Sequence, residues 1–244
     1  MASEHFFDDQ PTMLAALETA LRAQLLLSLD KAERATLFLS GGNSPVPLYR
    51  SLANSQLPWH RLDVALVDER WVPPDHDASN ERLVRETLLA GRATACRFTG
   101  MKNAFSLDVG QDDDKRSVDL AVAQCNSHYA QLSRPWSTAL LGMGPDGHTA
   151  SLFPHAHDLQ PALRSNAVCA AIHAAGSAVT GKHTQRMTMT PHGILQCEQL
   201  FLLFTGADKR DIYEQAKRTS DQTALPVSIF LQQTTVPLAV FWSP

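Results

Sequence analysis

The feature that most constrains the fold is a regular alternation of short apolar runs with segments of helical periodicity. Residues 35–39, 62–67 and 138–141 form apolar runs of the length and composition typical of buried strands. Helical segments follow the first two runs, and strands that alternate with helices form a mostly parallel sheet with helices on both faces. The sequence therefore predicts an α/β, Rossmann-like fold.

The same periodicities assign the rest of the chain. Helices are predicted at residues 11–34, 45–53, 79–89, 112–132, 191–196, 207–219 and 226–232, and a short helix is expected to begin near Thr149. Further strands are predicted at residues 167–172, 186–190, 199–204 and 236–242. Residues 68–77 are predicted to be a polar loop, and residues 91–111 to be loops with one short strand. No repeat or linker divides the chain, so we expect one domain over residues 1–244.

Charge and composition disfavour several classes of protein. The 244 residues include 21 Lys and Arg against 25 Asp and Glu, a formal net charge of −4, and 44% of them are hydrophobic. This acidic balance disfavours a dedicated nucleic-acid-binding protein, which needs basic surfaces to neutralise phosphates, and the apolar content disfavours disorder. We expect no nucleic-acid partner, and we expect a monomer because no exposed apolar seam stands out.

The sequence shows no mark of membrane insertion, export or cysteine chemistry. No run approaches the ~18 uninterrupted apolar residues that a membrane span needs. The first ten residues include Glu4, Asp8 and Asp9 and have no basic region followed by an apolar one, as a secretory signal would. The four cysteines are far apart with no C-x-x-C pair, which favours reduced core thiols. We expect a cytoplasmic protein that does not bind membranes.

A glycine turn, SGGNS at residues 40–44, follows the first predicted strand and opens a predicted helix. Backbone amides beside a helix N-terminus attract anions, and phosphate is the natural occupant. The turn lacks the G-x-x-x-x-G-K-[ST] pattern of a nucleotide P-loop, which favours a simple phosphoester over ATP. The competing interpretation is that the two glycines only form a tight turn. The candidate phosphate ligands are Gly41, Gly42, Asn43 and Ser44.

Charged residues follow the second predicted strand. Asp68, Glu69 and Arg70 come directly after an apolar run, although the surface would be a cheaper location for charge. Residues two apart share a side of an extended chain, so Asp68 and Arg70 are predicted to face the site and Glu69 to face a structural partner. A local salt bridge that fixes the loop is the competing interpretation.

A glycine-rich loop follows the third predicted strand. Residues 142–147 match G-x-G-x-x-G, but Asp146 would place negative charge where a pyrophosphate should bind, and no acidic residue about 20 positions further on holds a ribose. We therefore reject dinucleotide binding and predict that the loop presents Asp146 and His148 at the strand end. Imidazole can accept a proton from water near neutral pH, and a neighbouring carboxylate can orient it.

These three loops are expected to converge, because ligands of parallel sheets bind at the carboxyl ends of the strands. Lys182 and Arg186 are spare cations near a later strand and could cover the remaining phosphate oxygens. His155 and His157 form an H-x-H pair, but no carboxylate or cysteine at metal-ligand spacing accompanies it. We therefore predict no metal site.

Taken together, these motifs resemble those of 6-phosphogluconolactonases. The resemblance rests on SGG-x-SP at residues 40–45, DERWVP at 68–73 with His76, Ser79 and Asn80, LGMG-x-DGHTASLFP at 141–154, and RMTMT at 186–190. It covers most of the chain in the expected order and implies a sugar-phosphate isomerase/deaminase-like fold. The implied reaction is hydrolysis of 6-phospho-D-glucono-1,5-lactone to 6-phosphogluconate, the second step of the pentose phosphate pathway, without a required cofactor.

The wider superfamily includes glucosamine-6-phosphate deaminases and isomerases, and two positions separate them from this sequence. The deaminases resemble one another in an aromatic residue where Arg70 stands and in a catalytic glutamate five positions after the D-G-H histidine. That position is Phe153 here, and an apolar ring cannot shuttle protons. The proline-rich loop common in lactonases is altered around residues 176–185, which leaves the roles of Lys182 and His183 open.

Residues and resemblance together give one hypothesis for the site. His148 is the general base that takes a proton from the attacking water, and Asp146 orients its imidazole. Arg70 steadies either the developing oxyanion or the phosphate, and it could exchange roles with Arg186. The alternatives are a deaminase or isomerase and a non-catalytic sugar-phosphate sensor. The expected substrate ligands are Gly41, Gly42, Asn43, Ser44, Asp68 and Arg186.

Overall fold

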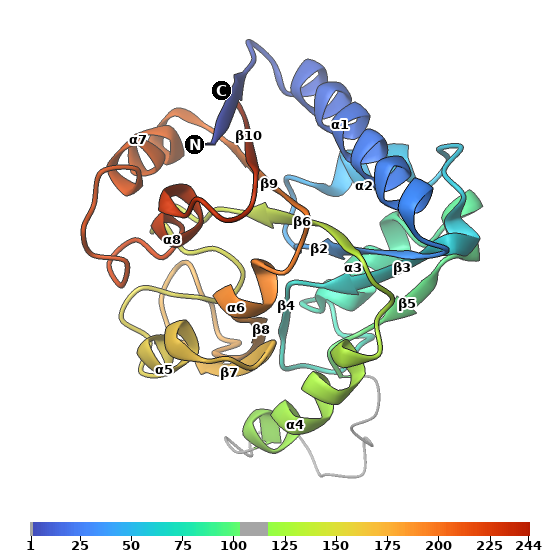
Figure 1. The fold of residues 1–244 in the computed structure, drawn as a ribbon. Helices are drawn as coiled ribbons and strands as arrows, with labels where there is room; N and C mark the ends of the chain where they lie inside the picture. Colours follow the sequence, from blue (N-terminus) through green and yellow to red (C-terminus); the bar gives the residue numbers. More distant parts are fainter. Residues whose placement is uncertain (1, 103–116) are drawn as a thin grey trace.

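The computed structural model describes residues 2–102 and 117–244, and its centre is a seven-stranded sheet (Figure 1). Every pair of neighbouring strands in it is parallel. The predicted α/β fold with a mostly parallel sheet is therefore confirmed. The strands lie in the order β1 (Ser3–Phe6), β10 (Leu238–Ser243), β9 (Gln199–Thr205), β6 (Trp136–Gly142), β2 (Ala35–Leu39), β3 (Leu62–Leu66) and β5 (Arg97–Thr99).

Helices cover both faces of this sheet. Figure 1 shows α1 (Gln10–Lys31) and α2 (Val46–Leu52) on one side, and α7 (Ala207–Ala216) and α8 (Ser228–Gln232) on the other. Strands β2 and β3 are buried along their whole length, as expected for strands covered on both faces. The other helices are α3 (Asn80–Thr87), α4 (Ser117–Ala130), α5 (Leu159–Arg164), α6 (Pro191–Ile194) and the 3₁₀ turns Trp59–Arg61 and Gly91–Ala95.

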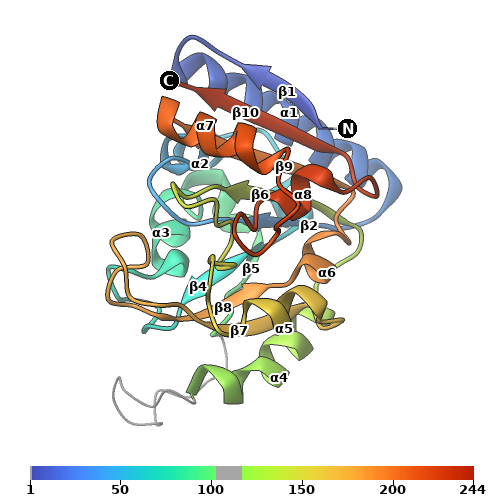
Figure 2. The same cartoon turned by 90° about the vertical axis from the view of Figure 1, so that its left-hand side faces the viewer.

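A second, antiparallel sheet has the strand order β4 (Asp68–Arg70), β8 (Gln185–Met189) and β7 (Cys169–His173), and lies below the parallel sheet in Figure 2. Strand β4 follows β3 after the single residue Val67, so the chain passes directly from one sheet into the other. The prediction of a loop at residues 68–77 is therefore wrong for its first three residues. They carry no alternation of apolar and polar side chains, and they form a strand because β8 lies alongside.

Other departures from the predicted elements are local. No helix begins at Thr149, because Ala150 has a φ of +49° and a bridge between Thr149 and Leu152 closes a turn. Strand β1 and helix α5 are absent from the prediction, and both are too short for a clear periodicity. The predicted start of the helix at 112–132 and the end of the loop at 91–111 lie outside the described residues.

Helix α1 is the one helix of the described residues that is long and apolar enough to cross a membrane, judged by length and mean hydropathy alone. In this fold its apolar face packs against β2, β6 and β10. Met13, Leu17, Leu21 and Leu25 are fully buried there. These contacts make α1 a core helix of the sheet, as its leucine spacing predicts.

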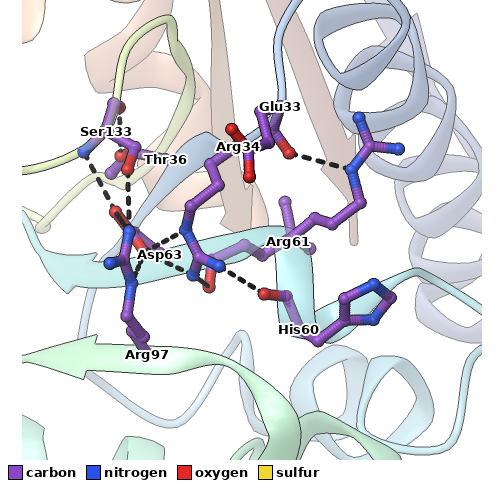
Figure 3. Close-up of polar contacts among 9 residues, drawn as sticks. Glu33, Arg34, Thr36, His60, Arg61, Asp63, Arg97 and Ser133 are labelled. Carbon is purple, nitrogen blue, oxygen red and sulfur yellow. Dashed lines mark hydrogen bonds and ion pairs between the residues drawn. The ribbon is translucent and has the colours of Figure 1, made fainter.

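A network of charged side chains joins the amino ends of β2, β3 and β5 (Figure 3). Asp63 accepts hydrogen bonds from Arg34 Nη2 at 2.8 Å, Arg97 Nε at 2.7 Å and the backbone N–H of Ser133 at 3.0 Å. Burial alone would raise the pKa of Asp63, but these donors outweigh it and lower the pKa to about 2. The network lies at the end of the sheet opposite the carboxyl ends of the strands. We therefore infer that it stabilises the fold and takes no part in ligand binding.

Candidate active site

A cavity of about 520 Å³ opens at the carboxyl ends of the central strands. The glycine turn after β2, the glycine-rich loop after β6 and the first turn of α7 after β9 all reach it, and β4 and β8 supply another wall. Asp146 is not among the lining residues, but it contacts His148, which is. The structure thus brings the predicted loops together. The predicted residues that line the cavity are Gly41, Gly42, Asn43, Ser44, Asp68, Arg70, His148 and Arg186.

The glycine turn is anchored to the loop after β6 by Ser40. The Ser40 hydroxyl donates to the carbonyl of Leu140 at 2.7 Å and accepts the N–H of Gly142 at 3.2 Å. Gly42 has a φ of +88°, in the left-handed region that favours glycine. Within the described part of the chain, no acceptor takes the backbone N–H groups of positions 41–43. These donors are available to an anion in the cavity.

The loop after β6 places a carboxylate in contact with an imidazole. Asp146 Oδ1 lies 2.5 Å from His148 Nδ1 and 3.1 Å from the backbone N of the same residue. A Cβ at Gly144 would overlap the imidazole ring, so only glycine fits beside it. Donation from Nδ1–H to Asp146 leaves the lone pair on His148 Nε2, where it can accept a proton.

Electrostatics favour an ionised Asp146. Burial alone would raise the pKa of Asp146, but the hydrogen bonds and charge of His148 outweigh it and hold the pKa below its ordinary value. Lys209, in the first turn of α7, also lines the cavity. Burial lowers the pKa of Lys209, and the charge of Asp146 acts in the opposite direction.

Lys209 is a site residue that the sequence reasoning missed. The signal was present, because residues 205–209 (TGADK) repeat the order of strand end, glycine and helix start that marks the glycine turn at 40–44. Gly206 in this segment has a φ of +95°, so the turn depends on glycine. Applying the rule of strand carboxyl ends to β9 would have found it.

Asp68 and Glu69 point to opposite sides of β4, as their alternation predicts. Asp68 lines the cavity, where its Oδ2 accepts from Ser151 Oγ at 2.6 Å and its Oδ1 from Asn80 Nδ2 at 3.3 Å. Glu69 is buried and accepts the backbone N–H groups of Asn80 and Glu81 at 2.7 Å each, which caps α3. Burial raises the pKa of Glu69 to about 7, although these donors act to lower it.

Arg70 and Arg186 are directly opposite each other in the register of β4 and β8. Arg186 is 4% exposed, and burial together with the charge of Arg70 lowers the pKa of Arg186 to about 10. Arg70 donates to the carbonyl of Ala78 at 2.7 Å, and Arg186 donates to those of Thr180 and His183 at 2.9 Å each. Like charges opposed in a sheet repel each other. An anion between the two guanidinium groups would remove this repulsion.

Phe153 lies between the imidazole and one of these guanidinium groups. Its ring centroid is 4.5 Å from that of His148, and Arg186 Cζ lies 5.5 Å from the Phe153 centroid. The ring is 5% exposed. It therefore packs against the candidate base and offers it no proton.

The remaining candidates, His76, His155, His157, Lys182 and His183, are not among the residues that line the cavity. The rings of His76 and His183 are 4.9 Å apart and join the two loops that Arg70 and Arg186 brace. Burial and the nearby cations lower the pKa of His183. His157 is exposed and pairs with Asp158. Across residues 2–102 and 117–244, no group of three or more His, Cys, Asp or Glu side chains is arranged to hold a metal ion.

Comparison with known sequences decides the family. The sequence model of the family described as glucosamine-6-phosphate isomerases/6-phosphogluconolactonase matches residues 8–242. The chain belongs to this glucosamine-6-phosphate isomerase/6-phosphogluconolactonase family. A 6-phosphogluconolactonase of Rhizobium meliloti is 32% identical over 243 residues, which cover 100% of this chain and 99% of the relative. A 6-phosphogluconolactonase of Pseudomonas aeruginosa is 33% identical over 229 residues, which cover 93% and 89% of the two chains.

Solved structures carry the same fold. A 6-phosphogluconolactonase from Shewanella baltica has a TM-score of 0.90 at 34% identity, and the match covers 100% of this chain and 98% of that chain. The 6-phosphogluconolactonase from Trypanosoma brucei, with a TM-score of 0.80 at 20% identity, shows the shared fold alone. The family name covers both isomerases and lactonases, and the relatives named here are all 6-phosphogluconolactonases.

Proposed function

We propose that this chain hydrolyses 6-phospho-D-glucono-1,5-lactone to 6-phospho-D-gluconate in the oxidative pentose phosphate pathway. The observation that carries the proposal is the 2.5 Å contact of Asp146 with His148, at the wall of a cavity that Arg70 and Arg186 also line. Asp146 and His148 together supply a general base that activates water, and the two arginines supply positive charge that binds an anionic sugar. Relatives named 6-phosphogluconolactonase that match the full chain support the same reaction.

In this mechanism, His148 Nε2 takes a proton from water while the water oxygen bonds to the lactone carbonyl carbon, C1. The carbonyl electrons move onto their oxygen, and Lys209, a cation that lines the same cavity as His148, stabilises the oxyanion. The oxyanion re-forms the carbonyl as the bond between C1 and the ring oxygen breaks, and the imidazolium returns the proton to the ring oxygen. The carboxylic acid so formed loses its proton to solvent and leaves as the carboxylate. Asp146 stabilises the imidazolium between the two steps. General-base assistance contributes about 10²- to 10⁴-fold, which suits a lactone that also opens unaided.

The substrate phosphate is held by the glycine turn together with the arginine pair. The backbone N–H groups at positions 41–43 and the hydroxyl of Ser44 are the donors of the turn, and Arg186 adds charge. Arg70 and Arg186 lie opposite each other in the register of β4 and β8, so one anion contacts both. Both arginines therefore bind the phosphate. Lys209 adds a third cation to the same cavity, and Asp68 accepts a hydrogen bond from a sugar hydroxyl.

Water attack on an activated ester carbonyl requires no metal ion, redox group or covalent nucleophile, so we propose no cofactor. We also propose a single-domain, cytoplasmic monomer that acts on a small sugar phosphate and binds neither nucleic acid nor membranes. The cavity that draws on residues 40–209 supports the single domain. Sedimentation velocity at assay concentration tests the monomer, and a concentration-dependent dimer would contradict it.

The experiment that tests the function compares three substrates. Freshly generated 6-phosphogluconolactone, glucono-1,5-lactone without the phosphate, and glucosamine 6-phosphate are each supplied to the purified chain. We expect acceleration above spontaneous hydrolysis for the first substrate, a kcat/KM at least about 10²-fold lower for the second because the phosphate contacts are lost, and no ammonia from the third. Ammonia release would favour a deaminase, and binding without turnover would favour a sensor.

A further inference from the structure

Asn80, the first residue of α3, joins two walls of the cavity. It is 1% exposed, and its Nδ2 donates to the backbone carbonyl of Asp68 at 2.9 Å and to the Asp68 carboxylate Oδ1 at 3.3 Å. The other carboxylate oxygen of Asp68 accepts from Ser151 Oγ at 2.6 Å. Both oxygens of Asp68 are therefore held by fixed donors, and Asn80 supplies one of them.

The carbonyl side of the same amide faces the glycine turn. A Cβ at Gly41 would overlap the Oδ1 and Cγ atoms of Asn80. The φ of Gly41 is outside the left-handed region, so glycine is required there for space rather than for backbone conformation. Within the described part of the chain, Asn80 Oδ1 has no hydrogen-bond partner. It faces the Cα–H of Gly41, a contact that recurs as a weak hydrogen bond.

Asn80 is itself held in one orientation. Its backbone N–H donates to Glu69 Oε1 at 2.7 Å, and the hydroxyl of Ser79 donates to Glu69 Oε2 at 3.0 Å. Glu69 lies in the same strand as Asp68, so β4 fixes the helix start that in turn fixes Asp68. These contacts hold the backbone from which the Asn80 side chain projects, and the amide itself is held by its two hydrogen bonds to Asp68.

We propose that Asn80 is a positioning residue for the lactonase reaction, which orients the Asp68 carboxylate toward the substrate and sets the spacing between Asp68 and the phosphate-binding glycine turn. It acts through Asp68 and Gly41, because its own amide oxygen is covered by the turn. The inference rests on the proposed function, since Asp68 is there the acceptor for a sugar hydroxyl.

The first test separates the hydrogen bond from the charge. Asn80→Asp keeps the shape of the side chain but puts two carboxylates together at Asp68. We expect KM to rise about tenfold, with kcat changed less than about threefold, and the melting temperature to fall. The exchange variant, Asn80→Asp with Asp68→Asn, restores an amide that donates to a carboxylate. We expect it to recover melting temperature but not KM, because the charge has left position 68.

The second test examines the space beside Gly41. We expect Gly41→Ala alone to lower the melting temperature and kcat/KM strongly, because its methyl group overlaps the Asn80 amide. Gly41→Ala combined with Asn80→Ala removes the overlap and should melt higher than Gly41→Ala alone. Gly142→Ala is the matched control for stability, since its methyl group would enter open space beside the same cavity.

The outcomes distinguish this inference from the function on which it rests. A wild-type chain without lactonase activity refutes the proposed function, whatever the melting temperatures show. With an active wild type, the positioning role is overturned if folded Asn80→Asp keeps the wild-type KM, or if the exchange variant restores KM together with stability. It is also overturned if Gly41→Ala has the melting temperature of the wild type. The same holds if adding Asn80→Ala to Gly41→Ala does not raise the melting temperature of that variant.

Discussion

At the scale of single residues, the proposed chemistry depends on which nitrogen of His148 carries a proton. The contact between Nδ1 and Asp146 fixes that choice, and the close approach of the ring to Gly144 fixes its plane. Phe153 packs on the ring and supplies no competing acid or base. The imidazole is thus held by its neighbours before a substrate arrives, which is the condition for efficient proton transfer.

We expect Asp146→Asn to lower kcat about 10²-fold while KM changes little. An amide at this position has no negative charge to stabilise the imidazolium, and it can favour the wrong tautomer. Steady-state kinetics on the lactone at pH 7 measure the effect. Asp158→Asn is the matched control, because Asp158 contacts His173 at 2.8 Å away from the cavity lining. Equal losses in both variants would contradict the assignment of Asp146.

Some of the site residues could be read from sequence and others could not. Asp146, His148 and Arg70 follow predicted buried strands, where charged or titratable side chains are costly unless they have a function. Asn80 belongs to the residues of the family resemblance, but its residue type gives no such signal, because its contact with Gly41 joins segments 39 positions apart in the chain. Only the folded structure shows that the glycine at 41 leaves space for an amide.

At the scale of elements, the strands buried on both faces were predictable, because a continuous apolar run marks such a strand in the sequence itself. β2, β3, β6 and β9 all lie where the sequence places them. β4 is different, because its three charged residues become a strand only by pairing with β8. The exposed edge strand β1 and the six-residue helix α5 are likewise decided by tertiary contacts.

We expect Asp63→Asn to lower the free energy of unfolding by about 2–4 kcal/mol at pH 7, because it leaves Arg34 and Arg97 (Figure 3) without their carboxylate. The folded-state pKa of Asp63 is lowered from 3.8 to about 2, so its contribution is present above pH 4 and is lost as the pH falls toward 2. Urea unfolding of both proteins at pH 7 and pH 3 measures the difference.

The difference in the free energy of unfolding between the wild type and Asp63→Asn should therefore be smaller at pH 3 than at pH 7. The lactonase activity of the folded variant should equal that of the wild type, since the network lies at the opposite end of the sheet from the cavity. A difference in unfolding free energy that grows at pH 3 would contradict the assigned electrostatics. A loss of activity in the folded variant would contradict the assigned location of function.

At the scale of the whole molecule, a chain with a net charge of −4 concentrates cations in one cavity. Arg70, Arg186 and Lys209 come from three separate segments and meet there. Composition cannot reveal this local polarity, because it averages over the surface. The structure shows it, because Lys209 follows the carboxyl end of β9 and Arg70 and Arg186 lie opposite each other in the antiparallel sheet.

We expect 6-phosphogluconate to raise the melting temperature of the wild type, because an anion relieves the repulsion between Arg70 and Arg186. At a concentration 100-fold above its dissociation constant, the ligand adds about 2.7 kcal/mol to the free energy of unfolding. Gluconate and potassium chloride at matched ionic strength should give much smaller shifts. Differential scanning fluorimetry of the wild type and Arg70→Met measures them, and an equal shift in Arg70→Met would contradict the anion site.

The most direct test of the central claim is the initial rate of 6-phosphogluconolactone hydrolysis by His148→Ala, measured in parallel with the wild type and corrected for spontaneous opening. We expect the wild type to accelerate hydrolysis and His148→Ala to lose about 10²- to 10⁴-fold in kcat, with a KM close to that of the wild type. A folded His148→Ala protein that turns over the lactone at the wild-type rate would contradict the account.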